Sequence, residues 1–451
     1  MEADWSELNP RERQRARFQR LLAVVDPPFE SRAAAGKYRT GVERLRDSIL
    51  LDNRSGVVPI LPLNQMFPAS HAGISFQRAM YDGPAAYGAW MRYLDDFDPD
   101  YYLGLDMASS GGLLDILGCR LYKWPGGGLS SGASYQCVDR EWMKAEEYTE
   151  LLADPSGFWL RKYLPRVFGA LAGLASLEPL VNIMELPPLM PNLASWGRPE
   201  VQEGLQVMMA AGREAWSRME LCREFNRRAQ ARGALVAWGG MSKAPFDLIG
   251  DTLRGAVGMV RDMFKQPEMI VEAAERLAPL MVRMGLDAAE SSGHPLVFMP
   301  LHRGDDDFMS EKQFEKLYWP SLKKVVVGLV EEGCVPLLFI EGRYDSRLDY
   351  LRDLPPGSTI CLFHRTDLGL ASEKLAKIAC IGGGVPAATL LFSTSDEVAA
   401  HCRAVVEQYG PRGGFILAGD SVLDRCPAEN LRAMLGANRR GAPGPRDADL
   451  Y

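Results

Sequence analysis

Short apolar runs alternate along the chain with longer stretches in which apolar residues recur every three or four positions. The long stretches predict amphipathic helices, for example over 83–97, 267–290, 310–332 and 395–408. Strands joined in this way by helices are parallel. The short runs predict eight β-strands, at 57–61, 101–105, 234–238, 295–299, 335–340, 358–362, 379–382 and 413–418.

The number of units favours an α/β fold with a single (β/α)8 TIM barrel, and an open doubly wound sheet is the alternative. No GxGxxG or GxxxxGK[ST] pattern follows a predicted strand, which removes the usual reason to prefer the open sheet. Two N-terminal segments, Pro10 to Val25 and Tyr38 to Leu51, have helical spacing and precede the repeating part. We therefore expect a helical extension at 1–50, the barrel at 51–440 and a flexible tail at 441–451.

The composition of the chain excludes several classes of function. The chain has 451 residues with 51 basic and 58 acidic side chains, a formal charge of -7 and no dense run of Lys and Arg, so nucleic acid is a poor partner. The first twenty residues are charged and polar, and no uncharged apolar stretch reaches about 18 residues, so we expect a soluble cytoplasmic protein without a membrane span. Eight scattered cysteines without a CxxC pair predict reduced, mostly buried thiols.

Polar side chains directly follow five of the predicted strands. In a barrel, catalytic groups come from the C-terminal strand ends and the loops just beyond them. We expect the acids and histidines among them to face one cavity there. The candidates, in chain order, are Asp106, His302, Arg303, Glu341, Arg343, His364 and Asp420.

Structural roles compete with catalytic ones at these positions. Asp305, Asp306 and Asp307 form an acidic loop, and Ser310 with Gln313 is a plausible capping box, so we favour a solvated loop for the three aspartates. Glu341 is either functional or paired with Arg343 or Arg347. Asp420 is either functional or has an N-cap-like role in the Gly419 turn.

The second half of the chain resembles the uroporphyrinogen decarboxylase superfamily, and within it the cobalamin-dependent methyltransferase branch. The resemblance covers roughly residues 50 to 440 and is strongest from 245 onward. Two late segments are similar to the family's GNVxP and GTxEEV motifs, and two more to its GGFIL and PxEN motifs. The residues that carry it are Pro245-Phe246-Asp247-Leu248 with 253–267, Met309 to Phe314 with Pro320, Val335 to Gly342, Gly384-Val385-Pro386, Ser393 to Val398, Gly413 to Leu417 and Pro427 to Leu431.

The resemblance implies a methyltransferase that moves a methyl group between a small, methoxylated substrate and a corrinoid cofactor or separate corrinoid protein. Methyltransferases of this superfamily hold zinc with a His-x-Cys pair and a later Cys, and these positions correspond to Phe339, Glu341 and Asp420. The thiolates are replaced by carboxylates, so a divalent metal such as zinc would be held by Glu341 and Asp420 with His302, or alternatively His364, as the nitrogen ligand, or a protonated carboxylate would act instead. Arg303, Arg343 and His364 are then expected to bind substrate.

Two other functions stay open. A cofactor-free lyase, a decarboxylase of a carboxylated small molecule, would use Asp106 and a histidine to move protons, and Asp106 falls where the decarboxylases carry an aspartate. The arginine-rich RQAGRY segment of those decarboxylases is not recognisable, which disfavours this function. The third possibility is a barrel that binds a ligand without catalysis.

Overall fold

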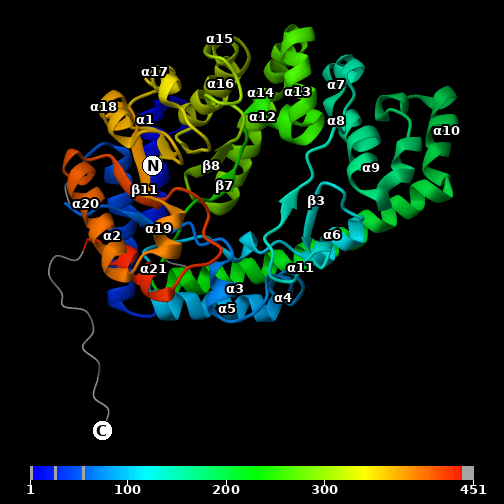
Figure 1. The fold of residues 1–451 in the computed structure, drawn as a ribbon. Helices are drawn as coiled ribbons and strands as arrows, with labels where there is room; N and C mark the ends of the chain where they lie inside the picture. Colours follow the sequence, from blue (N-terminus) through cyan, green and yellow to red (C-terminus); the bar gives the residue numbers. More distant parts are fainter. Residues whose placement is uncertain (1–3, 25–27, 53–55, 439–451) are drawn as a thin grey trace.

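A curled parallel sheet forms the centre of the molecule (Figure 1). The computed structural model describes residues 4–24, 28–52 and 56–438. Seven strands are hydrogen-bonded in the order β1-β12-β11-β10-β9-β8-β7, and β2 pairs with β6 in a separate two-stranded ladder. The strands are β1 (Ile60–Leu61), β2 (Tyr101–Tyr102), β6 (Leu235–Val236), β7 (Gly240–Met241), β8 (Leu296–Leu301), β9 (Val335–Ile340), β10 (Ile360–Phe363), β11 (Cys380–Val385) and β12 (Phe415–Gly419).

Each predicted strand overlaps a strand of this sheet or of the β2–β6 pair, so the α/β class and the TIM-like arrangement hold. The prediction of a closed eight-stranded barrel needs correction, because among the described residues no ladder joins β1 to β2 or β6 to β7. The first of these two openings has a local cause. Leu63 has a left-handed φ of 49°, so the backbone leaves the extended conformation directly after β1 and the ladder cannot continue.

The Asn64 side chain bridges this opening instead. Its Oδ1 accepts the Leu103 backbone N–H at 2.9 Å, and its Nδ2 donates to the Leu103 carbonyl at 3.4 Å. Asn64 is fully buried, so no water can replace it. One amide side chain therefore supplies both hydrogen bonds that a strand neighbour would have given to Leu103.

Replacement of Asn64 by alanine is expected to lower the free energy of unfolding by about 2–3 kcal/mol, because it leaves a buried N–H and C=O without partners. Urea denaturation followed by circular dichroism measures the change. Asn9→Ala, which removes an exposed helix cap, is the comparison and should cost only about 1 kcal/mol. An equal loss in both variants would contradict the bridging role of Asn64.

The N-terminal helices α1 (Pro10–Leu22) and α2 (Arg32–Ile49) cover the N-terminal ends of the strands. Their Phe18, Val42 and Leu45 belong to the same buried cluster as the inward-facing residues of the strands. Gln14 Nε2 donates to the Gly357 carbonyl before β10, and Arg17 Nε donates to the Glu332 carbonyl before β9. The C-terminal strand ends are thus left as the open end.

Helices α1 and α2 lie within the segment 1–50, and α2 begins earlier than the predicted Tyr38. The predicted end of the first helix at Val25 and the predicted tail at 441–451 lie outside the described residues. A second, larger core lies between the outer face of the sheet and the surrounding helices. These helices are α5 (Gly83–Phe97), α11 (Pro199–Ala231), α13 (Gly255–Lys265), α14 (Pro267–Ser292), α16 (Trp319–Glu331), α17 (Leu348–Leu351), α18 (Leu368–Leu375), α20 (Ser395–Tyr409) and α21 (Ala428–Leu435).

Short helices connect the larger elements. They are α3 (Phe67–His71), α4 (Phe76–Tyr81), α6 (Gly111–Leu117), α12 (Pro245–Asp247), α15 (Glu311–Gln313) and α19 (Ala387–Phe392). All eight cysteines are free and five of them are buried, as the sequence predicted. No helix in the described part of the chain is long and apolar enough to cross a membrane.

An insertion between α6 and α11 stands beside the sheet, and α11 runs back from it along the barrel (Figure 1). Its small strands are β3 (Tyr122–Pro125), β4 (Gly128–Leu129) and β5 (Gln136–Cys137), and its helices are α7 (Tyr148–Ala153), α8 (Pro155–Phe158), α9 (Leu164–Val167) and α10 (Leu186–Ala194). The helical path through α8 and α9 ends at Phe168, whose backbone is extended, and the glycine-containing 3-10 helix Gly169–Ser176 follows.

Candidate functional site

The inward-facing register of the strands continues into the polar residues beyond them. In β9, Val335, Leu337 and Phe339 lie in the inner core, so Glu341 is the next residue of that series. The same alternation leads from Ile360 and Leu362 to His364, and from Ile416 and Ala418 to Asp420. His302 lies one residue beyond β8, beside Glu341. The sequence-based choice of these four residues therefore matches the pleat of the strands.

His302 is held at one ring nitrogen and partly open at the other. Its Nδ1 lies 2.6 Å from Asp251 Oδ2, and its Nε2 lies 3.7 Å from Glu341 Oε1. The side chain is 33 % exposed. Burial alone would lower the pKa of His302, but the carboxylates of Asp251, Asp247 and Glu341 outweigh it and raise the pKa above its usual value. This arrangement favours an imidazolium with an accessible Nε2–H.

Asp251 collects three cationic groups. Besides the His302 ring, it accepts from Arg303 Nε at 2.7 Å and lies 2.7 Å from Lys243 Nζ. Burial would raise the pKa of Asp251, yet its bonds to His302 and Lys243 hold that pKa well below its usual range. Asp251 is therefore ionised over the whole physiological pH range and anchors the imidazolium electrostatically.

Asp247 fixes the backbone of the loop that carries His302. Its two carboxylate oxygens accept the backbone N–H groups of His302 at 3.0 Å and Arg303 at 3.1 Å. Tyr318 donates its hydroxyl hydrogen to the same carboxylate at 2.7 Å. Asp247 is fully buried, and burial, followed by the charge of Asp251, raises its pKa. The contacts give Asp247 a positioning role.

A π-helical turn brings Asp247 and Asp251 to the same place. Residues Leu248–Arg254 form a π-helix directly after α12, and Asp247 just before it and Asp251 within it both contact His302. Sequence reasoning missed Lys243, Asp251 and Tyr318, and it used Asp247 only as part of a resemblance. The i, i+4 spacing of two aspartates behind a strand end was the available signal.

The acidic loop after β8 is structural, as favoured from the sequence. Arg343 NH2 lies 2.9 Å from Asp307, and Arg347 Nε lies 3.5 Å from Asp306. The capping box is also confirmed, since Ser310 Oγ accepts the Gln313 N–H and Gln313 Oε1 accepts the Ser310 N–H. The alternative pairing of Glu341 with Arg343 or Arg347 is wrong, because both arginines are engaged by the acidic loop and Glu341 lies beside His302.

His364 and Asp420 take part in other contacts. His364 Nδ1 accepts the Gly342 N–H at 3.4 Å, and Asp420 Oδ1 accepts the Ala387 N–H at the start of α19 at 2.9 Å. Asp420 thus has a cap-like role, for a neighbouring helix rather than for the Gly419 turn. Within the described ranges, neither residue is hydrogen-bonded or ion-paired to His302 or Glu341.

Asp106 lies elsewhere, which corrects the expectation of a single cavity for all the candidates. It follows β2 in the 3-10 helix Leu105–Met107 and lines a cavity of about 710 Å³ between α11 and the end of α14, together with Asn226 and His294. The surrounding cavity walls desolvate the Asp106 carboxylate and raise its pKa, although the side chain is accessible to solvent from the cavity. His302 is not among the residues that line this cavity.

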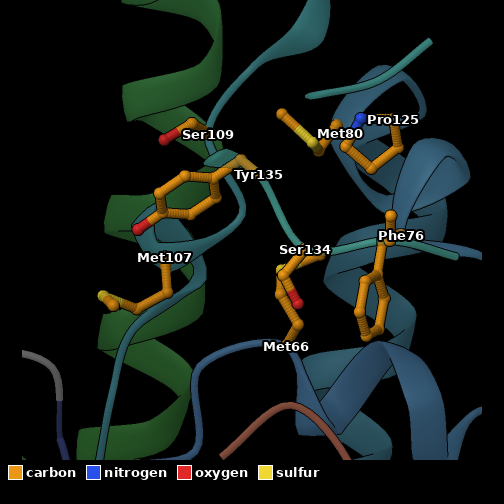
Figure 2. A pocket seen from close by; sticks show the side chains of 9 residues that line it. Met66, Phe76, Met80, Met107, Ser109, Pro125, Ser134 and Tyr135 are labelled. Atoms are coloured by element: carbon orange, nitrogen blue, oxygen red, sulfur yellow. The ribbon is translucent and has the colours of Figure 1, made fainter. Parts of the chain in front are cut away.

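The β3–β5 insertion reaches the open end of the sheet. Asp139 accepts the Ala256 N–H at 2.9 Å and lies 3.4 Å from Arg303 NH2. Beneath the insertion is a small pocket of about 10 Å³, room for roughly one water. Figure 2 shows that thioether and aromatic side chains surround it, and they come from Met66, Phe76, Met80, Met107 and Tyr135. Methionines re-pack readily, so this wall can adapt to an apolar group.

The three predicted metal ligands, His302, Glu341 and Asp420, do not meet at one point. In the described part of the chain, no three His, Cys, Asp or Glu side chains form a group that could hold a metal ion. His302 and Glu341 approach each other, whereas Asp420 caps α19. The residues as placed do not fit a three-ligand metal site, and the metal stays a prediction.

Comparisons with known proteins support the fold. No protein-family model and no curated protein matches the chain. A solved structure of a methyltransferase from Methanosarcina mazei is similar, with a TM-score of 0.55 and 13 % sequence identity over 89 % of this chain and 98 % of that chain. At this identity the similarity shows a shared fold alone. The resemblance to the uroporphyrinogen decarboxylase superfamily stays a prediction.

Proposed function

We propose that this chain is a methyltransferase that takes a methyl group from the oxygen of a small methoxylated substrate and passes it to a corrinoid. The observation that carries the proposal is the His302 imidazole, held by Asp251 and open toward Glu341 at the end of β8. The similar fold of a methyltransferase supports methyl transfer in general. The corrinoid, bound or carried by a separate protein, would supply the nucleophile.

Removal of a methyl group from an ether leaves the bonding electron pair on oxygen, so the departing oxygen needs a proton. The Nε2–H of protonated His302 donates it, and the ring becomes neutral. Asp251 stabilises the charged ring before the step and holds its orientation. Glu341, whose side chain is 44 % exposed, lies beside Nε2 and can return a proton from solvent to the ring. The proton transfers in this scheme are thus made by His302 and Glu341, and Asp251 holds the ring in place.

The two candidate arginines, Arg303 and Arg343, are held by carboxylates of the chain. Arg303 is bound to Asp251 and Asp139, so it orients Asp251 rather than meeting substrate. Arg343 is bound to Asp307. The apolar part of a methoxylated ring would lie beside the methionines under the insertion, which would have to re-pack because the pocket there has room for about one water.

The test is a methyl-transfer assay of the purified protein with Co(I) cobalamin and a series of methoxylated benzenes. The expected result is methylcobalamin and the free phenol in equal amounts. Phenol without methylcobalamin would indicate hydrolysis and overturn the proposal, as would no turnover of any methyl donor. Metal analysis of the wild type, Glu341→Ala and Asp420→Ala tests the predicted metal, which requires metal in the wild type and its loss in both variants.

Glu341→Gln is expected to lower kcat/KM about tenfold and to move the alkaline limb of its pH profile to lower pH. The negative charge of Glu341 raises the pKa of His302, so its removal lets the ring lose its proton at lower pH. Glu373→Gln, on the outer helix α18, is the matched control and should leave the profile unchanged. A shift of the limb to higher pH would contradict the assignment.

A further inference from the structure

Residues 177–198, named the arm below, carry an unusual amount of exposed apolar surface. The arm contains the 3-10 helix Leu180–Asn182, α10 and the 3-10 helix Ser195–Gly197. It lies near the far end of α11, away from the sheet (Figure 1). Six of its large apolar side chains are 44 to 82 % exposed, and these are Leu180, Val181, Met184, Leu186, Met190 and Leu193.

The helix α10 lacks the support that a helix of its length needs. It has nine residues, Pro191 lies inside it, and none of its residues is buried against the described part of the chain. Isolated helices of this length are marginal in water and depend on the packing of an apolar face. Leu186, Met190 and Leu193 are spaced i, i+4 and i+7, so the exposed face is one apolar stripe.

The base of the arm is nevertheless rigid. Leu171, Leu174, Leu177 and Val201 form a separate buried cluster there. A Cβ atom on Gly173 would lie 1.9 Å from the Glu200 carbonyl oxygen, so the chain before the arm packs directly on the start of α11. At the tip, Asn192 Nδ2 donates to the carbonyls of Asn182 and Pro188, both at 2.8 Å. The stripe is thus presented on a preformed surface, which lowers the cost of binding.

We propose that the arm is a dimer interface that packs against the arm of a second copy of this chain around a two-fold axis. The exposed stripe with the adjoining Leu180, Val181 and Met184 provides on the order of 500 Å² of apolar surface, the upper range for a monomer. With a polar rim, this approaches the ~800 Å² per partner of a stable interface. In such a two-fold contact the apolar stripe of one copy packs against the identical stripe of the other, so the interface needs no pairing of opposite charges.

The composition of the arm argues against other occupants. The charged residues of the arm are Glu178, Glu185 and, at its last position, Arg198. Helices that lie on membranes carry Lys and Arg toward the anionic headgroups, whereas α10 has no charged residue. The segment 439–451 contains Leu450 and Tyr451 as its only large apolar residues, too few to cover six side chains. A charge-poor apolar patch is typical of homodimer interfaces.

The test is analytical ultracentrifugation of the full chain at about 1 to 50 µM, where a dimer is expected in the upper part of the range. The double variant Leu186→Glu with Met190→Glu should be monomeric throughout, with an unchanged circular dichroism spectrum. Phe392→Glu, which adds a charge at an equally exposed apolar residue of α19, is the matched control and should remain dimeric.

Four results would overturn the proposal. They are a wild-type monomer at about 50 µM, a dimer that persists in the double variant, a dimer lost when residues 439–451 are removed, and a monomer that binds anionic vesicles through the arm. The measurement does not depend on catalysis, so it is independent of the proposed methyl transfer.

Discussion

His302→Gln is expected to lower kcat/KM for methyl transfer from an aryl methyl ether about 100- to 1,000-fold. General acid catalysis contributes roughly this much where the leaving group needs a proton. Glutamine keeps a hydrogen-bond donor of similar size but cannot transfer a proton. Since Asp251 would still be neutralised by Lys243 and Arg303, the local structure should survive the substitution.

The pH dependence separates this role from a structural one. His302 has a raised pKa, so the active imidazolium is present at low pH and is lost as the pH rises through that pKa. The wild type should therefore show an alkaline limb in log kcat/KM, and His302→Gln should lack it. Donors whose phenol is a better leaving group should recover much of the lost rate in the variant, because they need less protonation.

His71→Gln is the matched control for this prediction. His71 forms the same kind of pair, with its Nε2 2.6 Å from Asp96 Oδ2, but it lies in α3 away from Glu341 and Asp251. The control should keep both the rate and the alkaline limb. A variant at His302 that retains its rate, or that loses it equally for all leaving groups, would mean that His302 is not the acid.

The order and bounds of many helices and strands could be predicted from the sequence, because they follow from the local spacing of apolar residues. The run Val335–Ile340 is apolar on both faces and became β9 with the predicted bounds, and Gly83–Phe97 became α5. The opening between β1 and β2 could not be predicted. It depends on the left-handed backbone at Leu63 and is bridged by one amide at Asn64, and neither leaves a periodic signal.

The candidate site was predictable to the extent that strand ends define it. His302 and Glu341 were found because each follows an apolar run, and the structure places them next to each other. Lys243 and Asp251 were missed because they come from the segment after β7, where no long apolar run precedes them; Asp251 lies in the π-helix Leu248–Arg254 and Lys243 contacts Asp251 from before it. Asp106 was grouped with the others because its position at a strand end does not tell which cavity the side chain lines.

Arg254→Met is expected to lower the free energy of unfolding by about 3–5 kcal/mol, the largest effect on stability among the variants considered. Arg254 and Asp262 are a buried ion pair, with side chains 2 % and 3 % exposed and Nε 2.6 Å from the carboxylate. Loss of the guanidinium leaves the Asp262 carboxylate buried without a cation, which costs far more than the loss of an exposed pair.

The same guanidinium ties the site to the insertion, which makes this variant informative about function. Arg254 ends the π-helix that carries Asp251, and it also donates to Glu141 and to the Met143 carbonyl. Asp139, near this anchor, contacts Arg303. Loosening of the anchor should therefore raise KM more than it lowers kcat, since the insertion borders the site while His302 keeps its own partners.

Urea denaturation and steady-state kinetics on Arg254→Met measure both effects. Arg283→Met removes an exposed i, i+4 pair with Asp287, whose side chains are 75 % and 59 % exposed, and should change stability by no more than about 0.5 kcal/mol. The double variant Arg254→Met with Asp262→Leu replaces both charges by apolar groups and should regain part of the stability, because no buried charge remains alone. Equal destabilisation by Arg254→Met and Arg283→Met would show that the buried pair does not anchor the insertion.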